Sequence, residues 1–310
     1  MFCILAFIAL SIISIFSASH RKLAKEAFDC VFRRITLRPC TTGFKEKMKA
    51  QLVGTLLSRS AVAARIVNRH FELLSWILFI TTVASIFWTG KGLYNYYMYG
   101  SCNGLNKTGF CALDPKGENN KVTQTGGSCV DGARDESKVT LANVNLNLFP
   151  TVDKGVKDSV ALIGCYSCDY TRKAYPLIQK LISENQVNYT FAHYPIKEEM
   201  LYLLPIGYCA YNQDRNKYWR LNDKLFASSK EDIAKKEFVE NILGELGYDV
   251  SVINSCSQSP QTQAAVVAQR IELEKTNIYG TPLVFINGKG LVGPKPYRVY
   301  ERILKGFRFW

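Results

Sequence analysis

The stretch VALIGCYSC at residues 160–168 decides the fold of this 310-residue chain. Residues 160–163 are a short apolar run that ends at Gly164, which is typical of a buried strand. The tetrapeptide Cys165-Tyr166-Ser167-Cys168 follows at once, and residues 169–184 then carry apolar side chains at helical spacing. The sequence therefore predicts a strand, a Cys-x-x-Cys turn and a helix in direct succession.

The predicted position of Cys165 suits a nucleophile. A cysteine between a strand and a helix lies near the unpaired N–H groups and the positive dipole end of that helix, which stabilise a thiolate. Thiolate is the species that attacks a disulfide. Cys168, one turn further on the same side, can then attack the mixed disulfide and release the substrate. The spacing fits two-step thiol–disulfide exchange, with no cofactor beyond the redox-active disulfide itself.

Three other interpretations of the tetrapeptide compete with a redox site. Half of a zinc site is one, but the domain has no second Cys-x-x-Cys or Cys-x-x-His pair, and His193 is its only histidine, so no metal is expected. A structural disulfide and a chance occurrence are the others. The strand-to-helix context favours the redox interpretation over all three.

The pattern around this stretch predicts a small α/β unit with a helical insertion. Strands are expected at residues 144–149, 187–193, 283–286 and 291–293, and Asn287-Gly288 predicts a hairpin turn between the last two. Residues 198–275 are mostly helical in pattern, with helices expected at 201–211, 218–226, 233–246 and 262–275. A terminal helix is expected at 297–304. Gly280-Thr281-Pro282 precedes an apolar strand, where a proline is tolerated and a cis bond would turn the backbone sharply.

Together these motifs resemble a known family. The CYSC group after a strand, CAYNQDRNKYWRLNDKLF at 209–226 and YGTPLVFINGKGLVG at 279–293 resemble the DsbA-like branch of the thioredoxin superfamily, over about residues 141–310. The resemblance implies a thioredoxin-like fold with a helical insertion at about 198–275.

The resemblance also implies roles for individual residues. Cys165 would be the exposed nucleophile and Cys168 the resolving thiol. Pro282 would be a cis-proline facing the two cysteines, and the backbone of Thr281 would pair with an extended substrate segment. Cys209 and Cys256 occupy places where many relatives carry a structural disulfide; two buried free thiols are the alternative.

The dipeptide between the cysteines departs from the family pattern. Strongly oxidising members have Pro-His there, whereas this chain has Tyr166-Ser167. A histidine at this place stabilises the thiolate, and Tyr and Ser are expected to do so less. Net oxidation, net reduction and isomerisation of disulfides therefore all stay open.

The N-terminal hundred residues predict a membrane-anchoring region, mostly helical. Uncharged apolar runs cover residues 2–16 and 73–88, each slightly shorter than the ~20 residues that span a bilayer. Trp88 and the tyrosines after it suit an interfacial aromatic belt, so a transmembrane helix is expected at 71–99, with a buried core helix as the alternative. Residues 1–18 are expected to be a transmembrane helix or signal anchor; a cleaved signal peptide is the alternative.

Charge predicts the topology. Residues 19–70 contain twelve Lys and Arg against three Asp and Glu, and account for +9 of the net charge of +13. The positive-inside rule places this basic segment in the cytoplasm and the later residues outside. Attraction to anionic lipid headgroups explains the basicity better than nucleic acid does, so the bilayer is the expected partner and nucleic acid is not.

Seven of the ten cysteines follow the second apolar run, where disulfides can persist. Residues 100–140 predict an extracytoplasmic linker that a local Cys102–Cys111 bridge can pin, with Cys129 left over. Cys3, Cys30 and Cys40 are expected to be reduced thiols.

The expected function is a membrane-anchored protein disulfide oxidoreductase with its catalytic domain outside the cell membrane. Its substrates would be exported cysteine-containing proteins, and the resemblance implies re-oxidation by a quinone-linked thiol oxidase of the membrane. A disulfide reductase or isomerase is the alternative within enzymes. A non-catalytic thioredoxin-fold binding or chaperone module is the alternative from another class.

Overall fold

A computed structural model describes residues 18–36, 38, 43–124 and 138–306 of the chain. Backbone contacts divide it into two units, one up to Gly90 and one from Lys91 onward. The apolar run at residues 2–16 lies outside the described residues, as do Cys3, Cys40 and Cys129.

The first unit is helical. It contains α2 (Ala18–Ile35), α3 (Phe44–Leu57) and most of α4 (Ala61–Tyr99). Lys47 on α3 pairs with Glu26 on α2 at 3.1 Å, and Ala27 and Cys30 of α2 are buried.

Helix α4 is 39 residues long and its backbone leaves helical geometry at His70 (φ −112°, ψ 23°). The stretch predicted to cross a membrane, residues 71–99, therefore begins directly after this kink. Among the described residues α4 is the one helix long and apolar enough to cross a membrane. Its large apolar side chains are mostly exposed, including Ile77, Ile80 and Phe87, so it does not resemble a buried core helix.

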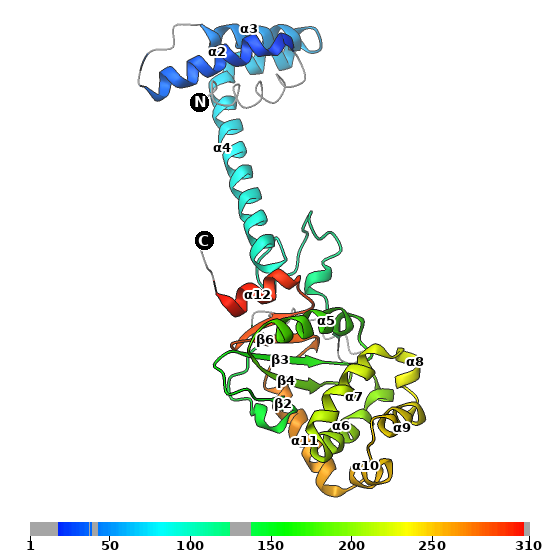
Figure 1. The fold of residues 1–310 in the computed structure, drawn as a ribbon. Helices are drawn as coiled ribbons and strands as arrows, with labels where there is room; N and C mark the ends of the chain where they lie inside the picture. The colour runs from blue at the N-terminus through cyan, green and yellow to red at the C-terminus, as the bar shows by residue number, and fades with distance from the viewer. Residues whose placement is uncertain (1–17, 37, 39–42, 125–137, 307–310) are drawn as a thin grey trace. The chain divides into compact units, whose positions relative to one another are not determined.

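The second unit is built on a five-stranded mixed sheet (Figure 1). In spatial order the strands are β2 (Thr151–Val152), β4 (Asn188–His193), β3 (Ser159–Gly164), β6 (Leu283–Ile286) and β7 (Lys289–Val292). The β3–β4 pair is parallel and the other pairs are antiparallel. The apolar run quoted above is thus the central strand, which explains why both of its faces are apolar.

Side chains alternate between two cores across β3. Val160 and Leu162 pack in the larger core with α5 (Asp169–Glu184), α12 (Tyr297–Lys305) and the helical block. Ala161 and Ile163 pack on the opposite face of the sheet in a smaller core.

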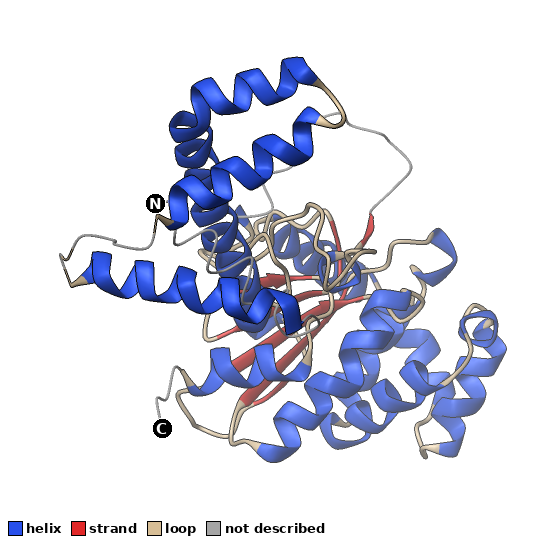
Figure 2. Cartoon of the chain, turned by 90° about the horizontal axis from the view of Figure 1, so that it is seen from above, coloured by secondary structure: helices blue, strands red, loops and turns tan. Residues whose placement is uncertain are grey.

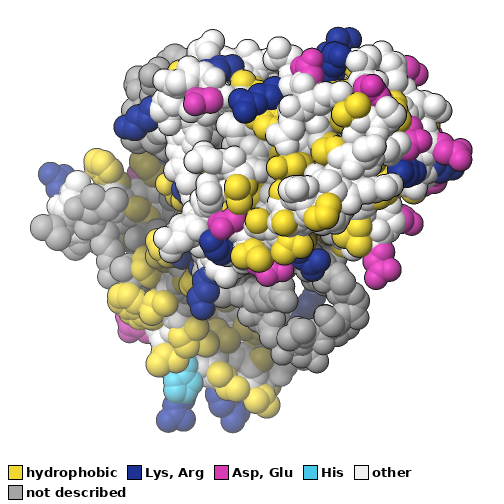
Figure 3. All heavy atoms as spheres, turned by 90° about the horizontal axis from the view of Figure 1, so that it is seen from below, with side chains coloured by type: hydrophobic (Ala, Val, Ile, Leu, Met, Phe, Trp, Pro, Cys, Tyr) yellow, Lys and Arg dark blue, Asp and Glu magenta, His cyan; other side chains and the backbone are white. Residues whose placement is uncertain are grey.

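The predicted insertion is a block of six helices between β4 and β6, which lies beside the sheet in Figure 2. They are α6 (Leu203–Gln213), α7 (Arg215–Ala227), α8 (Lys230–Ile233), α9 (Lys236–Glu245), α10 (Val250–Ser257) and α11 (Pro260–Glu274). Lys/Arg and Asp/Glu side chains are intermingled on the face shown in Figure 3, as expected of a solvated helical surface. The predicted α/β fold with a helical insertion is confirmed.

Local chemistry explains three differences from the predicted elements. Residues 144–149 are not a strand: the side chain of Asn145 accepts a hydrogen bond from the N–H of Asn147 and starts the 3-10 turn η3 (Leu146–Leu148), so the strand forms later, as β2. The helix expected at 233–246 forms as α9, which begins at Lys236, and the short helix α8 that precedes it was not predicted. Helix α10 was not separately predicted; Asp249 caps its first turn.

Residues 100–124, expected to be a linker, belong to the second unit and contact its strands β5 and β7. Cys102 and Cys111 form a disulfide. The buried side chain of Asn106 donates to the carbonyl of Gly290 (2.9 Å) and accepts from the N–H of Val292 (2.8 Å) on β7. Further along, η1 (Glu118–Asn120) leads into the two-residue strand β1 (Thr123–Gln124), which pairs with β5 (Gly280–Thr281).

Candidate active site

A glycine and a threonine fix the turn between β3 and α5. A Cβ on Gly164 would lie 2.5 Å from Cγ2 of Thr171, so only glycine allows this approach. The N–H of Cys165 is 3.4 Å from the hydroxyl oxygen of Thr171, which accepts its hydrogen bond. Cys168 is the N-cap of α5, so both cysteines lie at the N-terminal end of the helix, as predicted.

Both cysteine side chains are buried. Cys165 is 0% and Cys168 3% exposed. The family resemblance implied an exposed nucleophile, and the structure differs. Strand β1, from the segment expected to be a linker, pairs with β5 directly before Pro282.

The surroundings of Cys165 favour its thiolate. Its pKa falls to about 6, chiefly because the Cys168 thiol donates a hydrogen bond to it, and further because Ser167 and the backbone N–H of Ile196 donate. The Ser167 oxygen lies 3.1 Å from Sγ of Cys165. The pKa of Cys168 is raised, first by that same hydrogen bond to Cys165 and then by burial. Cys165 is therefore the thiolate of the pair and Cys168 keeps its proton.

Tyr166 points into the core and away from the thiols. Its ring packs on Phe226 (4.8 Å between centroids) and Phe191 (5.4 Å). Its hydroxyl donates to the side-chain oxygen of the fully buried Asn222 on α7, at 2.7 Å. The side chain between the cysteines thus attaches the active-site turn to the helical block.

Arg172 makes a second attachment that sequence reasoning missed. Its guanidinium donates to the carbonyl oxygens of Tyr166 (2.6 Å), Ser228 (2.6 Å) and Leu225 (3.4 Å). It therefore links the Cys-x-x-Cys turn to the C-terminal end of α7. A basic residue in the first turn of a helix was the available signal, but one sequence does not show where its side chain points.

Thr281 ends β5, and Pro282 lies between β5 and β6. The peptide bond between them is cis. Leu283 pairs with Ile163 across β6 and β3, which brings Pro282 beside Gly164 and the cysteines. The side chain of Thr281 is fully buried, and its hydroxyl oxygen has no hydrogen-bond partner among the described residues.

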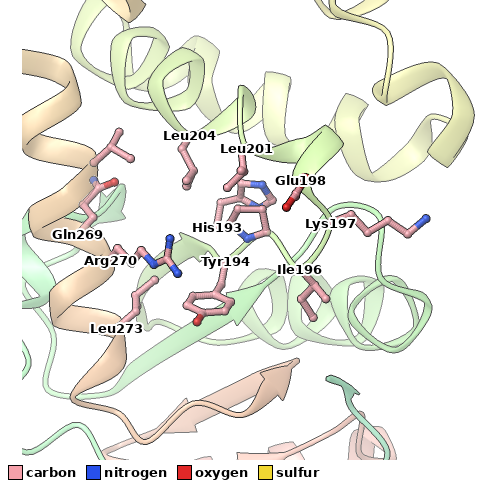
Figure 4. Close-up of a pocket in the computed structure, with 12 residues that line it drawn as sticks. His193, Tyr194, Ile196, Lys197, Glu198, Leu201, Leu204, Gln269, Arg270 and Leu273 are labelled. Carbon is pink, nitrogen blue, oxygen red and sulfur yellow. The ribbon is translucent and has the colours of Figure 1, made fainter. Parts of the chain in front are cut away.

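His193, at the end of β4, lies behind Tyr166, with 4.4 Å between ring centroids. Burial lowers its pKa to about 4, so it is neutral at physiological pH. It also lines a pocket of about 400 Å³ next to the thiols. Figure 4 shows Leu201 and Leu204 on one side of this pocket and residues of α11 on the other.

The remaining predicted site residues lie apart from the thiols. Cys209 on α6 and Cys256 on α10 form a disulfide within the helical block. Among the described residues, no three His, Cys, Asp or Glu side chains are grouped so that they could hold a metal ion.

A family model matches part of the second unit. Residues 159–306, from β3 through α12, match the family model described as Thioredoxin. This part of the chain is therefore thioredoxin-like, as the resemblance implied. No curated protein matches the chain.

Three solved structures are among those similar to this chain. The thiol-disulfide exchange protein alpha-DsbA2 from Wolbachia pipientis is 18% identical (TM-score 0.47; 51% of this chain, 86% of that one). Oxidised BdbD from Bacillus subtilis is 17% identical (TM-score 0.45; 53% and 96%). A thioredoxin-like oxidoreductase from Silicibacter pomeroyi is 20% identical (TM-score 0.47; 56% and 96%).

Proposed function

We propose that this chain is a DsbA-like protein thiol–disulfide oxidoreductase that introduces disulfides into exported proteins. The observation that carries the proposal is the environment of Cys165: a thiol at a helix N-terminus, with its pKa held near 6 by donors from Cys168, Ser167 and Ile196. The cis Thr281-Pro282 peptide beside it belongs to the same thioredoxin-like domain.

The two thiols have different roles in the proposed reaction. With Cys165 and Cys168 joined as a disulfide, a substrate thiolate attacks Sγ of Cys165, and Cys168 leaves as a thiolate and takes a proton. A second substrate thiolate then attacks the substrate sulfur of this mixed disulfide and expels Cys165. Two electrons pass from the substrate to the enzyme, which ends with Cys165 as a thiolate and Cys168 as a thiol; the protons that the substrate thiols lose go to solvent, except for the one that Cys168 takes up.

The stabilised thiolate favours oxidation as the net direction. A low pKa at Cys165 stabilises the reduced enzyme, and a couple whose reduced form is stable is the stronger oxidant. The hydrogen-bond donors to Cys165 are the Cys168 thiol, Ser167 and the backbone N–H of Ile196. The absence of a histidine between the cysteines therefore does not remove this effect.

The proposed location is the outer face of a cell membrane, with α4 as the anchor. Its exposed apolar side chains and the basic residues before it support an orientation with the catalytic domain outside. A quinone-linked thiol oxidase of the membrane, implied by the resemblance, would return the dithiol to the disulfide. Protease treatment of sealed cells tests the orientation: cleavage within residues 19–70 from outside would contradict it.

Activity on a reduced, disulfide-containing test protein tests the proposed chemistry. We expect the oxidised full-length chain to restore the test protein's disulfides, Cys165→Ala to abolish this, and Cys30→Ala, which alters a buried cysteine of the first unit, to leave it unchanged. Full activity of Cys165→Ala would exclude Cys165 as the nucleophile, and a wild-type chain without activity would leave a binding module.

Redox titration of the Cys165/Cys168 couple tests the direction. We expect a potential well above the about −270 mV of thioredoxin. A value at or below that of thioredoxin would favour a reductase.

A further inference from the structure

The backbone edge beside the cis-proline is already paired. Strand β1 runs antiparallel to β5, with Thr123 opposite Thr281 and Gln124 opposite Gly280. Strand β1 comes from the segment before the thioredoxin-like domain, more than 150 residues away in sequence from β5. We call residues 121–124 the strap.

The strap lies directly on the redox site. A Cβ on Gly280 would be 2.6 Å from Cγ2 of Val122 and 2.7 Å from the carbonyl oxygen of Thr123, so glycine at 280 makes room for the strap backbone. The side chain of Thr123 is near enough to Cys168 to lower the pKa of its thiol. Cys168 is 3% exposed and Cys165, its neighbour in the turn, is fully buried.

The residues just before the strap hold it in place. The buried Nζ of Lys295 donates to the carbonyl oxygen of Asn119 (2.9 Å) and to the side-chain oxygen of Asn120. Asn120 in turn donates to the carbonyl of Lys107 at 2.9 Å. Gly293, at φ +77°, lets the backbone of Asn120 and Lys121 approach to distances that a Cβ would block.

We propose that the strap occupies the place of an extended polypeptide substrate, and that substrates reach the dithiol only by displacing it. That the displacing partner is a polypeptide substrate rests on the proposed function. The arrangement is β-augmentation within one chain: the strap pairs with β5 by main-chain hydrogen bonds, as an incoming peptide would. The strap pairs over only two residues, shorter than the usual 3–10, so an extended substrate segment can replace these few main-chain bonds with equivalent ones.

The strap and the residues before it, 118–120, are held differently, as an exchangeable cover requires. Buried side-chain hydrogen bonds and the glycine at positive φ keep residues 118–120 on the domain. The strap itself is Lys-Val-Thr-Gln, mostly polar and therefore soluble when released. Displacement would free the redox edge without detaching the rest of the segment.

Alkylation by iodoacetamide tests the strap independently of enzyme turnover. The probe reacts with the Cys165 thiolate of the reduced full-length chain, and mass spectrometry follows the rate near pH 7. The variant Val122→Gly/Thr123→Gly/Gln124→Gly keeps the chain length but removes the side chains that cover Gly280 and Cys168. We expect it to be alkylated at least tenfold faster than the wild type. The matched control Ala112→Gly/Leu113→Gly changes exposed residues of the same segment and should react at the wild-type rate.

A second variant weakens the attachment of residues 118–120 instead of changing the strap itself. Asn120→Ala removes the bonds to Lys107 and Lys295, and we expect alkylation to be accelerated several-fold. Equal alkylation rates for the wild type, the triple-glycine strap variant and Asn120→Ala would overturn the proposal. If both variants are alkylated faster than the wild type, but the wild type forms no disulfides in a test protein, the strap is supported and the proposed function is rejected.

Discussion

The hydroxyl oxygen of Ser167 lies 3.1 Å from Sγ of Cys165, inside the turn that joins the two cysteines. The serine and the thiol of Cys168 both donate to the Cys165 sulfur, and the pKa of Cys165 falls to about 6. Replacing the hydroxyl removes one donor and leaves the others. We expect Ser167→Ala to raise the pKa of Cys165 by about half a unit to one unit, which is roughly 0.7–1.4 kcal/mol.

The pH dependence of thiolate absorbance measures this pKa in the reduced protein. Ser183→Ala, which alters an exposed serine of α5 that bonds only to its own helix, is the matched control and should leave the pKa near 6. The redox potential of Ser167→Ala should fall with the rise in pKa, since the reduced form loses stabilisation. An unchanged pKa would show that Ser167 has no part in setting the thiolate.

The hydroxyl of Tyr166 satisfies a buried acceptor on another helix. Tyr166→Phe leaves the side-chain oxygen of Asn222 without this donor, and an unsatisfied buried acceptor costs about 1–3 kcal/mol. We expect the free energy of unfolding to fall by that amount in denaturant titrations. Tyr170→Phe, on the first turn of α5, is the control and should change stability by less than about 0.5 kcal/mol. A loss no larger than in the control would contradict the attachment role of Tyr166.

The close approach of Gly164 to Thr171 predicts a coupled pair of substitutions. Gly164→Ala should destabilise by about 1–3 kcal/mol because its Cβ meets Cγ2 of Thr171. Adding Thr171→Ser removes that methyl group, keeps the hydroxyl and should restore part of the loss. Gly244→Ala, on α9 with open space around it, should be neutral or slightly stabilising. Thermal unfolding of the wild type, Gly164→Ala, Thr171→Ser, their double variant and Gly244→Ala measures these changes. Strict additivity of Gly164→Ala and Thr171→Ser in the double variant would reject the contact.

Burial of His193 predicts that the domain loses stability in mild acid. Its pKa is about 4 in the folded chain and about 6.5 when unfolded, so between these values the unfolded chain binds more protons. The free energy of unfolding should therefore fall as the pH falls from about 6.5 to about 4, by up to about 3 kcal/mol from this group. Denaturant titrations at about pH 7 and about pH 4.5 should show a smaller loss for His193→Gln than for the wild type. Equal losses would contradict a buried neutral imidazole.

The sequence predicted the central architecture because the signals were local. The apolar run of β3, the Cys-x-x-Cys turn and the helical spacing of α5 lie within about 25 residues and agree with one another. The error at residues 144–149 arose where a single asparagine cap outweighed an alternating pattern. Helix α8 was missed because its four residues make only about one helical turn, too short to show a periodic pattern.

The contacts that shape the site could not be predicted, because they join residues distant in sequence. Asn222 meets Tyr166 across 56 residues, and Thr123 meets Thr281 across more than 150. Residues 100–124 are polar and rich in glycine, which indicates a loop but not the surface on which the loop packs. The roles of Cys165, Cys168, Thr281 and Pro282 stay predictions; the structure adds the arrangement in which they can be tested.

Trapping of a mixed disulfide tests the central claim most directly. In Cys168→Ala the resolving thiol is gone, so a substrate that reacts with Cys165 stays attached. We predict that mass spectrometry of the full-length variant, after incubation with a test protein carrying an activated disulfide, finds that protein bonded to Cys165. Attachment to another cysteine, or no adduct when the same test protein is captured by a free thiol, would contradict Cys165 as the nucleophile.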